Sequence, residues 1–127
     1  MKYGFSKAVS LPYDQAIEKI TGELKKEGFG VLTEIDVKET LKKKLNVDFK
    51  KYKILGACNP PIAHKALQLE EELGLLLPCN VIVYEKEGKS IVSVFNPMII
   101  TQLLDNKDMV NIAEEIKTKL LAALERV

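Results

Sequence analysis

Hydrophobic and polar residues alternate along several short stretches of the chain, and such alternation is typical of β-strands with one buried face. The predicted strands are Tyr3–Val9, Phe29–Val37, Tyr52–Cys58, Cys79–Glu85 and Ser90–Phe95. The segment Lys86–Lys89 contains the glycine that a tight turn needs, so the last two strands are expected to form an antiparallel hairpin.

The second predicted strand has one mainly apolar face and one mainly polar face. The alternation places five residues on the apolar face, namely Phe29, Val31, Thr33, Ile35 and Val37. The opposite face would then hold Gly30, Leu32, Glu34 and Asp36. An antiparallel sheet covered on one side only produces this pattern.

Three longer stretches carry hydrophobic residues at the spacing of a helix with one buried side. They are Leu11–Glu27, Pro60–Leu73 and Asp108–Arg126, with Asn59 and Asp108 as the predicted N-caps of the last two. Gly28 and Gly74 are predicted to end the first two, because glycine readily takes the left-handed conformation that follows many helices. Asp36 and Glu39 predict the start of a further short helix that ends near Asn46.

Together these elements predict an α+β domain with a mainly antiparallel five-stranded sheet and helices on one face. No linker or low-complexity stretch divides the 127 residues, so residues 1–127 are expected to form a single domain. The predicted core consists of Phe29, Val31, Ile54, Leu55, Ala66, Val81, Val83, Ile116 and Leu120.

The charge balance bears on partners and location. With 19 basic and 18 acidic residues the net charge is +1, which gives no overall field to attract a polyanion, so no nucleic acid is expected. The basic run Lys42–Lys44 is interpreted as a solvated helix face.

No stretch reaches the roughly 18 apolar residues of a membrane span. The amino end lacks the apolar core of a secretory signal, so no membrane association and a cytoplasmic location are expected.

Several motifs resemble the domain of unknown function 302 family. They are Leu55-Gly56-Ala57-Cys58-Asn59-Pro60, the helix start Ala63–Leu67, the stretch Gly74–Val81 and the upstream block Glu27–Val37. The resemblance spans nearly the whole chain. It implies an antiparallel sheet in a β-α-β(4)-α, TBP-like plan with extra short helices, and a homodimer, but no established activity or cofactor. Leu32, Ile82 and Tyr84 are candidates for an apolar surface that a second copy would cover.

The candidate site centres on two cysteines. Cys58 ends a predicted strand just before a helix, where the positive end of the helix dipole favours a thiolate, so Cys58 is a candidate reactive thiol. Its alternative role is packing as a small apolar residue. Cys79 begins the next strand, and the two cysteines lie at the same end of the sheet only if these strands are antiparallel neighbours.

Three other residues complete the candidate binding set. His64 lies in the first turn of the helix after Cys58 and could join Cys58 and Cys79 as a third soft metal ligand, although a solvated position is favoured. Asn59 and Asn80 could supply amide groups at the strand ends, or act only in capping and turns.

No nucleophile with a base and an orienting group, and no phosphate-binding glycine loop, is found in the sequence. A homodimeric module that binds a small-molecule ligand or a partner is therefore the leading hypothesis. The alternatives are a thiol-dependent redox or sulfur-handling protein that uses Cys58, and a metal-binding protein that uses Cys58, Cys79 and His64.

Overall fold

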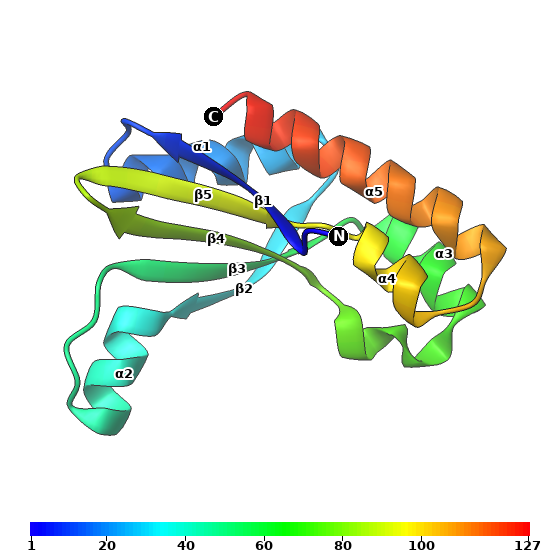
Figure 1. Cartoon of the computed structure of the whole chain (residues 1–127), viewed down its shortest axis with the longest axis horizontal. Coiled ribbons are helices and arrows are strands. Elements are labelled where there is room, and N and C mark those ends of the chain that lie inside the picture. Colours follow the sequence, from blue (N-terminus) through cyan, green and yellow to red (C-terminus); the bar gives the residue numbers. More distant parts are fainter.

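The computed structural model describes residues 1–127, and its centre is a sheet of five antiparallel strands (Figure 1). The strands are β1 (Gly4–Val9), β2 (Gly30–Asp36), β3 (Tyr52–Cys58), β4 (Cys79–Lys86) and β5 (Lys89–Phe95). They lie in the order β1-β5-β4-β3-β2. β4 and β5 form the predicted hairpin, and Glu87 and Gly88 both have the positive φ that a two-residue turn of this hand requires.

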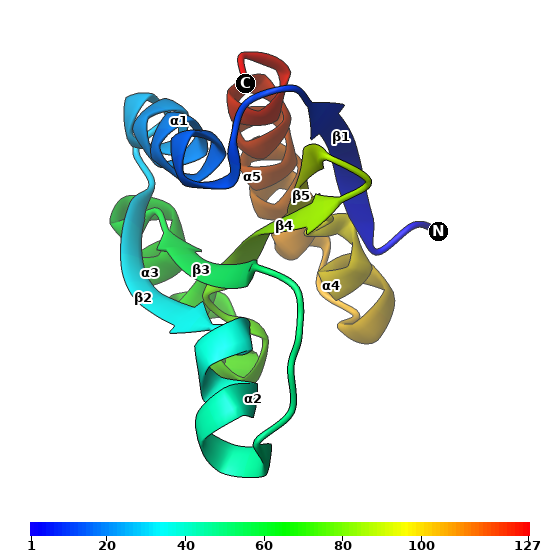
Figure 2. The ribbon, with the colours of Figure 1, turned by 90° about the vertical axis from the view of Figure 1, so that its left-hand side faces the viewer.

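Five α-helices and one 3₁₀ helix accompany this sheet, and they lie together in one layer except for the second α-helix, which packs against β2 and β3. They are α1 (Tyr13–Lys26), α2 (Val37–Leu45), α3 (Pro60–Leu69), α4 (Met98–Leu103), α5 (Lys107–Glu125) and the 3₁₀ helix η1 (Glu71–Leu76). α1 and α5 pack side by side over one face (Figure 2). α3 packs against α5 and η1, and extends the helical layer beyond the end of the sheet. The predicted α+β fold with a five-stranded antiparallel sheet is therefore confirmed.

The main core lies between the sheet and the helices α1 and α5. Alternate residues of the central strands are almost fully buried there, with Ile20, Leu24 and Leu120 of the helices packed onto them. The predicted core residues are all buried except Val31 and Ile54. Ile54 is half-buried because it precedes Leu55, and adjacent residues of a strand point to opposite faces. The uncovered side of the sheet, called the open face below, contains Ile35, Tyr52, Ile54, Ile82, Tyr84 and Ile91.

β2 departs from the predicted alternation at Leu32. Val31 lies opposite Ala57 and Thr33 lies opposite the preceding residue of β3, so Leu32 is an extra, unpaired residue. Such a β-bulge moves all following residues to the other face of the sheet. Ile35 therefore lies on the open face and is 48% exposed. The single apolar face predicted for Phe29–Val37 is wrong beyond the bulge.

The ends of the helices confirm some predictions and correct others. α1 is followed by Gly28 with φ 87°, and Asp36 caps α2 by accepting a hydrogen bond of 3.0 Å from the Glu39 amide, both as predicted. α3 ends at Leu69 and not at Leu73, because the extended backbone at Glu70 breaks the helix.

Past that break, η1 directs the Leu73 side chain toward a small second core. Gly74 lies within η1 and so does not end a helix. The N-cap of α5 is Asn106 and not Asp108, since the Asn106 side chain accepts the hydrogen bond from the Asp108 amide.

A buried carboxylate joins α1 to the end of α5. Glu23 accepts hydrogen bonds from Arg126 at 2.6 Å, Lys19 at 2.9 Å and Lys26 at 3.1 Å. These hydrogen bonds, above all the one from Arg126, lower the pKa of Glu23 from 4.5 to about 2. The pairing therefore fixes the C-terminal end of the chain against the first helix.

None of the helices has the length and apolar character that crossing a membrane would require.

Candidate functional site

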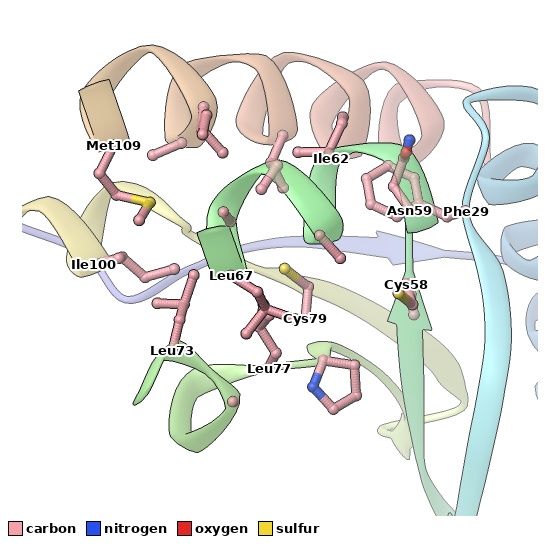
Figure 3. Close-up of a pocket in the computed structure, with 18 of the residues that line it drawn as sticks. Phe29, Cys58, Asn59, Ile62, Leu67, Leu73, Leu77, Cys79, Ile100 and Met109 are labelled. Carbon is pink, nitrogen blue, oxygen red and sulfur yellow. The ribbon is translucent and has the colours of Figure 1, made fainter. Parts of the chain in front are cut away.

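An apolar pocket of about 260 Å³ lies between α3, α5 and η1 and the adjoining ends of β3 and β4 (Figure 3). Hydrophobic residues make up 16 of the 19 that line it. The lining residues are Phe29, Leu32, Ala57, Cys58, Asn59, Ile62, Ala63, Ala66, Leu67, Leu73, Gly74, Leu77, Pro78, Cys79, Ile100, Met109, Ile112, Ala113 and Ile116. No charged side chain is among them.

The pocket exists because the hydrophobic interior is divided into two clusters. The main core contributes one wall, which includes Phe29, Cys79 and Ile116. The second cluster consists of Ala66, Leu73, Ile100 and Met109, and it contributes the opposite wall. Protein interiors are normally packed without voids larger than a water molecule, so an accessible gap between two cores is a specific feature of this fold.

Small side chains on the two flanking helices keep this gap open. Ala63 and Ala66 of α3 and Ala113 of α5 all line the pocket, and α3 packs against α5. Because alanine ends at Cβ, the helices can lie close together while space remains between the larger residues around them. A larger side chain at any of these positions would project into the pocket.

The structure brings the two cysteines to the same pocket. β3 and β4 are antiparallel neighbours, and Cys79 lies opposite Ala57, the residue before Cys58. Cys79 is 4% exposed, and burial, with a smaller contribution from Cys58, raises its pKa to about 12. The Cys79 thiol is therefore neutral and inert at physiological pH. Cys58 is partly exposed, so it is the thiol that reaches both the pocket and solvent.

Asn59 lines the pocket and is only 9% exposed, although it is polar. It occupies the N-cap position of α3, as predicted, but its side chain makes no capping hydrogen bond. Its amide nitrogen instead donates to the Glu27 carbonyl oxygen at 3.2 Å, which ties the start of α3 to the end of α1. A Cβ at Gly28 would lie 2.9 Å from the Asn59 amide nitrogen, so glycine makes room for this contact.

The remaining candidate residues lie outside the pocket. His64 is exposed on α3, on a side of the helix that does not line the pocket. Asn80 is exposed on β4 and faces a separate shallow depression beside Pro78 and Phe95. Cys58, His64 and Cys79 do not form a metal-binding group, and no three His, Cys, Asp or Glu residues lie together as metal ligands would.

Most of the pocket residues were not predicted from the sequence. The bulge in β2 directs Leu32 toward the pocket, and Ala113 and Met109 lie at least 30 residues from both cysteines in the sequence. The only local signal is the pair of alanines in α3, Ala63 and Ala66. The pocket contains no acid, base or metal ligand beyond the thiols, so the geometry is suited to binding an uncharged, apolar molecule.

Comparison with known proteins gives the family. The chain matches the family described as "Domain of unknown function DUF302" over residues 5–127. It is also similar to the crystal structure of an uncharacterized conserved DUF302 protein from Bacillus stearothermophilus, at 31% identity and a TM-score of 0.92. That match covers 99% of this chain and 98% of the other. A comparison with curated proteins finds no match. The chain belongs to the DUF302 family.

Proposed function

We propose that this protein is a binding module for small hydrophobic molecules, with the pocket between the two cores as its binding site. The observation that carries this proposal is a pocket of about 260 Å³ with no charged side chain in its lining. Ligand sites are typically concave and mainly apolar, with few polar groups. An engineered apolar cavity of about 150 Å³ in another protein binds benzene, so this pocket has room for a larger guest.

The energetics of packing support a bound ligand. A cavity costs about 24 cal/mol per Å³, which for this volume gives about 6 kcal/mol as an upper bound, because the pocket is open to solvent. That amount is comparable with the whole stability of a typical domain, about 5–15 kcal/mol. A ligand that fills the space would recover part of this cost.

The test is to titrate the purified protein with uncharged hydrophobic probes and to follow binding by calorimetry and thermal shift. We expect saturable binding that Ala113→Leu abolishes, because the new side chain projects into the pocket. The matched control is Val110→Leu, on the same helix but outside the pocket. Absence of binding by any probe, or equal binding by the Ala113 variant, would refute the proposal.

A thiol-dependent redox or sulfur-handling function is the second candidate, because Cys58 is partly exposed and lines the same pocket. No lining residue could act as a base for its thiol. The test is whether Cys58 is alkylated faster than a free model thiol at neutral pH. A rate at or below that of the model thiol would leave binding as the only proposal for the pocket.

We further propose that the protein is a homodimer that buries the open face of the sheet. This face carries Ile82 and the stacked rings of Tyr52 and Tyr84, whose centroids are 5.2 Å apart. Large aromatic side chains of this kind often anchor protein interfaces. Helix α2 packs against the neighbouring strands β2 and β3 and has no buried residue. Leu45, which is 65% exposed, adds to its apolar area.

Sedimentation velocity at micromolar concentration tests the assembly. We expect a dimer for the wild type and a monomer for Ile35→Glu. The control is Val110→Glu, which should stay dimeric because Val110 lies on α5, on the side of the sheet away from the open face. A monomeric wild type would refute this part of the proposal.

A cytoplasmic location stays a prediction, supported by two cysteines that form no disulfide.

A further inference from the structure

The polar groups of the pocket are concentrated at one end, which bears on the chemistry of a ligand if the proposed binding function holds. Asn59 lies with Phe29 at one end, while Ile100 and Met109 lie at the other (Figure 3). Cys58 adjoins Asn59 at the end of β3. The far end has only hydrocarbon and thioether groups. A molecule that matches this lining has a polar head and an apolar tail.

The polar end lacks what an anionic head would need. A helix N-terminus binds anions through free backbone N–H groups, but the first two residues of α3 are Pro60 and Pro61, which have none. The amide of Ala63 already donates to the Asn59 carbonyl oxygen at 2.8 Å, which leaves Ile62 as the only amide of the first turn without a helical partner. No Lys, Arg, Asp or Glu lines the pocket. The head that fits here is therefore uncharged and forms hydrogen bonds.

The dimensions of the pocket favour a chain over fused rings. The α5 residues that line it run from Met109 to Ile116, seven residues at 1.5 Å each, or about 10 Å. Scaling from the roughly 150 Å³ cavity that holds the six carbons of benzene, the present volume holds about ten carbon atoms. A space of this volume over this length is narrow, which suits a linear tail.

Leu32 is placed to cover the polar end. The bulge in β2 frees Leu32 from strand pairing beside Val31, whose partner Ala57 directly precedes Cys58. Leu32 lines the pocket although it is 66% exposed, so it lies at the mouth. Bulges commonly redirect a side chain beside a functional site.

From these observations we infer that the pocket takes a neutral amphiphile with a linear tail of about eight to ten carbons, such as an alcohol, amide or ester. The head lies between Cys58 and Asn59 beneath Leu32, and the tail extends to Ile100 and Met109. Leu32 acts as a cap that slows release of the bound molecule.

The first experiment measures affinity for straight-chain alcohols of increasing length, using residues 1–127. Each added methylene should raise affinity about fourfold until the pocket is full at about ten carbons. Decanol should bind at least about tenfold more tightly than decanoate or decylamine, because the charged heads lose hydration without gaining a partner. Equal binding of the charged analogues, or no dependence on chain length, would overturn the inference while leaving apolar binding intact. Failure of every probe would instead refute the proposed function itself.

The second experiment tests orientation and the role of Leu32. Leu32→Ala should increase the dissociation rate of decanol about fivefold, whereas Ile35→Ala, the matched change on the same strand outside the pocket, should leave it unchanged. Methyl NMR signals of Met109 should shift with decanol and not with hexanol, while those of Leu32 respond to both. Equal dissociation rates in the two variants, or a shift of the Met109 signal when only hexanol is added, would overturn the assigned orientation.

Discussion

Replacing Ala113 by leucine is expected to stabilise the ligand-free protein, although the position is only 1% exposed. The side chain points into the pocket between Met109 and Ile116, so the added carbons occupy existing space. Three more buried carbons contribute about 0.8 kcal/mol each, and ordering the leucine side chain costs about 0.5–1 kcal/mol. The net gain is about 1.5 kcal/mol, which for a domain of this size raises Tm by about 5 °C.

The control is the same substitution at Ala123, on the same helix but within the main core. Ala123 is 0% exposed and does not line the pocket, so leucine there should overpack the core and cost about 1–3 kcal/mol. Urea unfolding followed by circular dichroism gives both free energies under one set of conditions. If Ala113→Leu destabilises the protein as much as Ala123→Leu, the space attributed to the pocket does not exist in solution and the argument for ligand binding fails.

Three further predictions follow from other features. Gly56→Ala should cost about 1–3 kcal/mol, because its Cβ would clash with the Thr33 hydroxyl and lie 2.9 Å from the Pro78 ring. Gly22→Ala, with open space around it, should instead stabilise α1 by about 1 kcal/mol, and calorimetry distinguishes the two signs. Iodoacetamide at pH 8 should modify Cys58 and leave Cys79 intact until the protein unfolds, since the pKa of Cys79 is about 12; comparable rates would contradict its burial. Arg126→Gln should lower stability by an amount that is constant above pH 4.5 and shrinks as the pH falls toward 2. The reason is that the folded-state pKa of Glu23 is lowered and its stabilisation is lost on protonation; a gap independent of pH would refute this.

The sequence predicts those parts of the fold that depend on neighbouring residues. The β4–β5 hairpin, the end of α1 at Gly28 and the cap at Asp36 follow from turn and capping chemistry that acts over a few positions. The bulge at Leu32 could not be seen, because Ile35 beyond it is apolar although it lies on the open face, so the alternation in the sequence continues unbroken. Its presence depends on how β2 pairs with β3.

The candidate site shows the same limit. Cys58, Asn59 and Cys79 could be identified because they flank predicted strand ends, and all three line the pocket. His64 and Asn80 share that local setting but point elsewhere, since their direction is set by the helix and strand phase. The alanines that create the space are ordinary helix residues in the sequence. Their role emerges only when α3 and α5 are brought together by the whole fold.

The division of the interior into two clusters separates the stability of the sheet from the shape of the pocket, whereas most small domains have one core for both. The larger cluster, beneath α1 and α5, holds the strands together. The smaller cluster joins only α3, η1, α4 and the start of α5. We expect the smaller cluster to open locally while the sheet stays folded, so its amides should exchange with solvent sooner than those of β4 and β5. Substitutions in the smaller cluster should thus reshape the pocket with little loss of global stability.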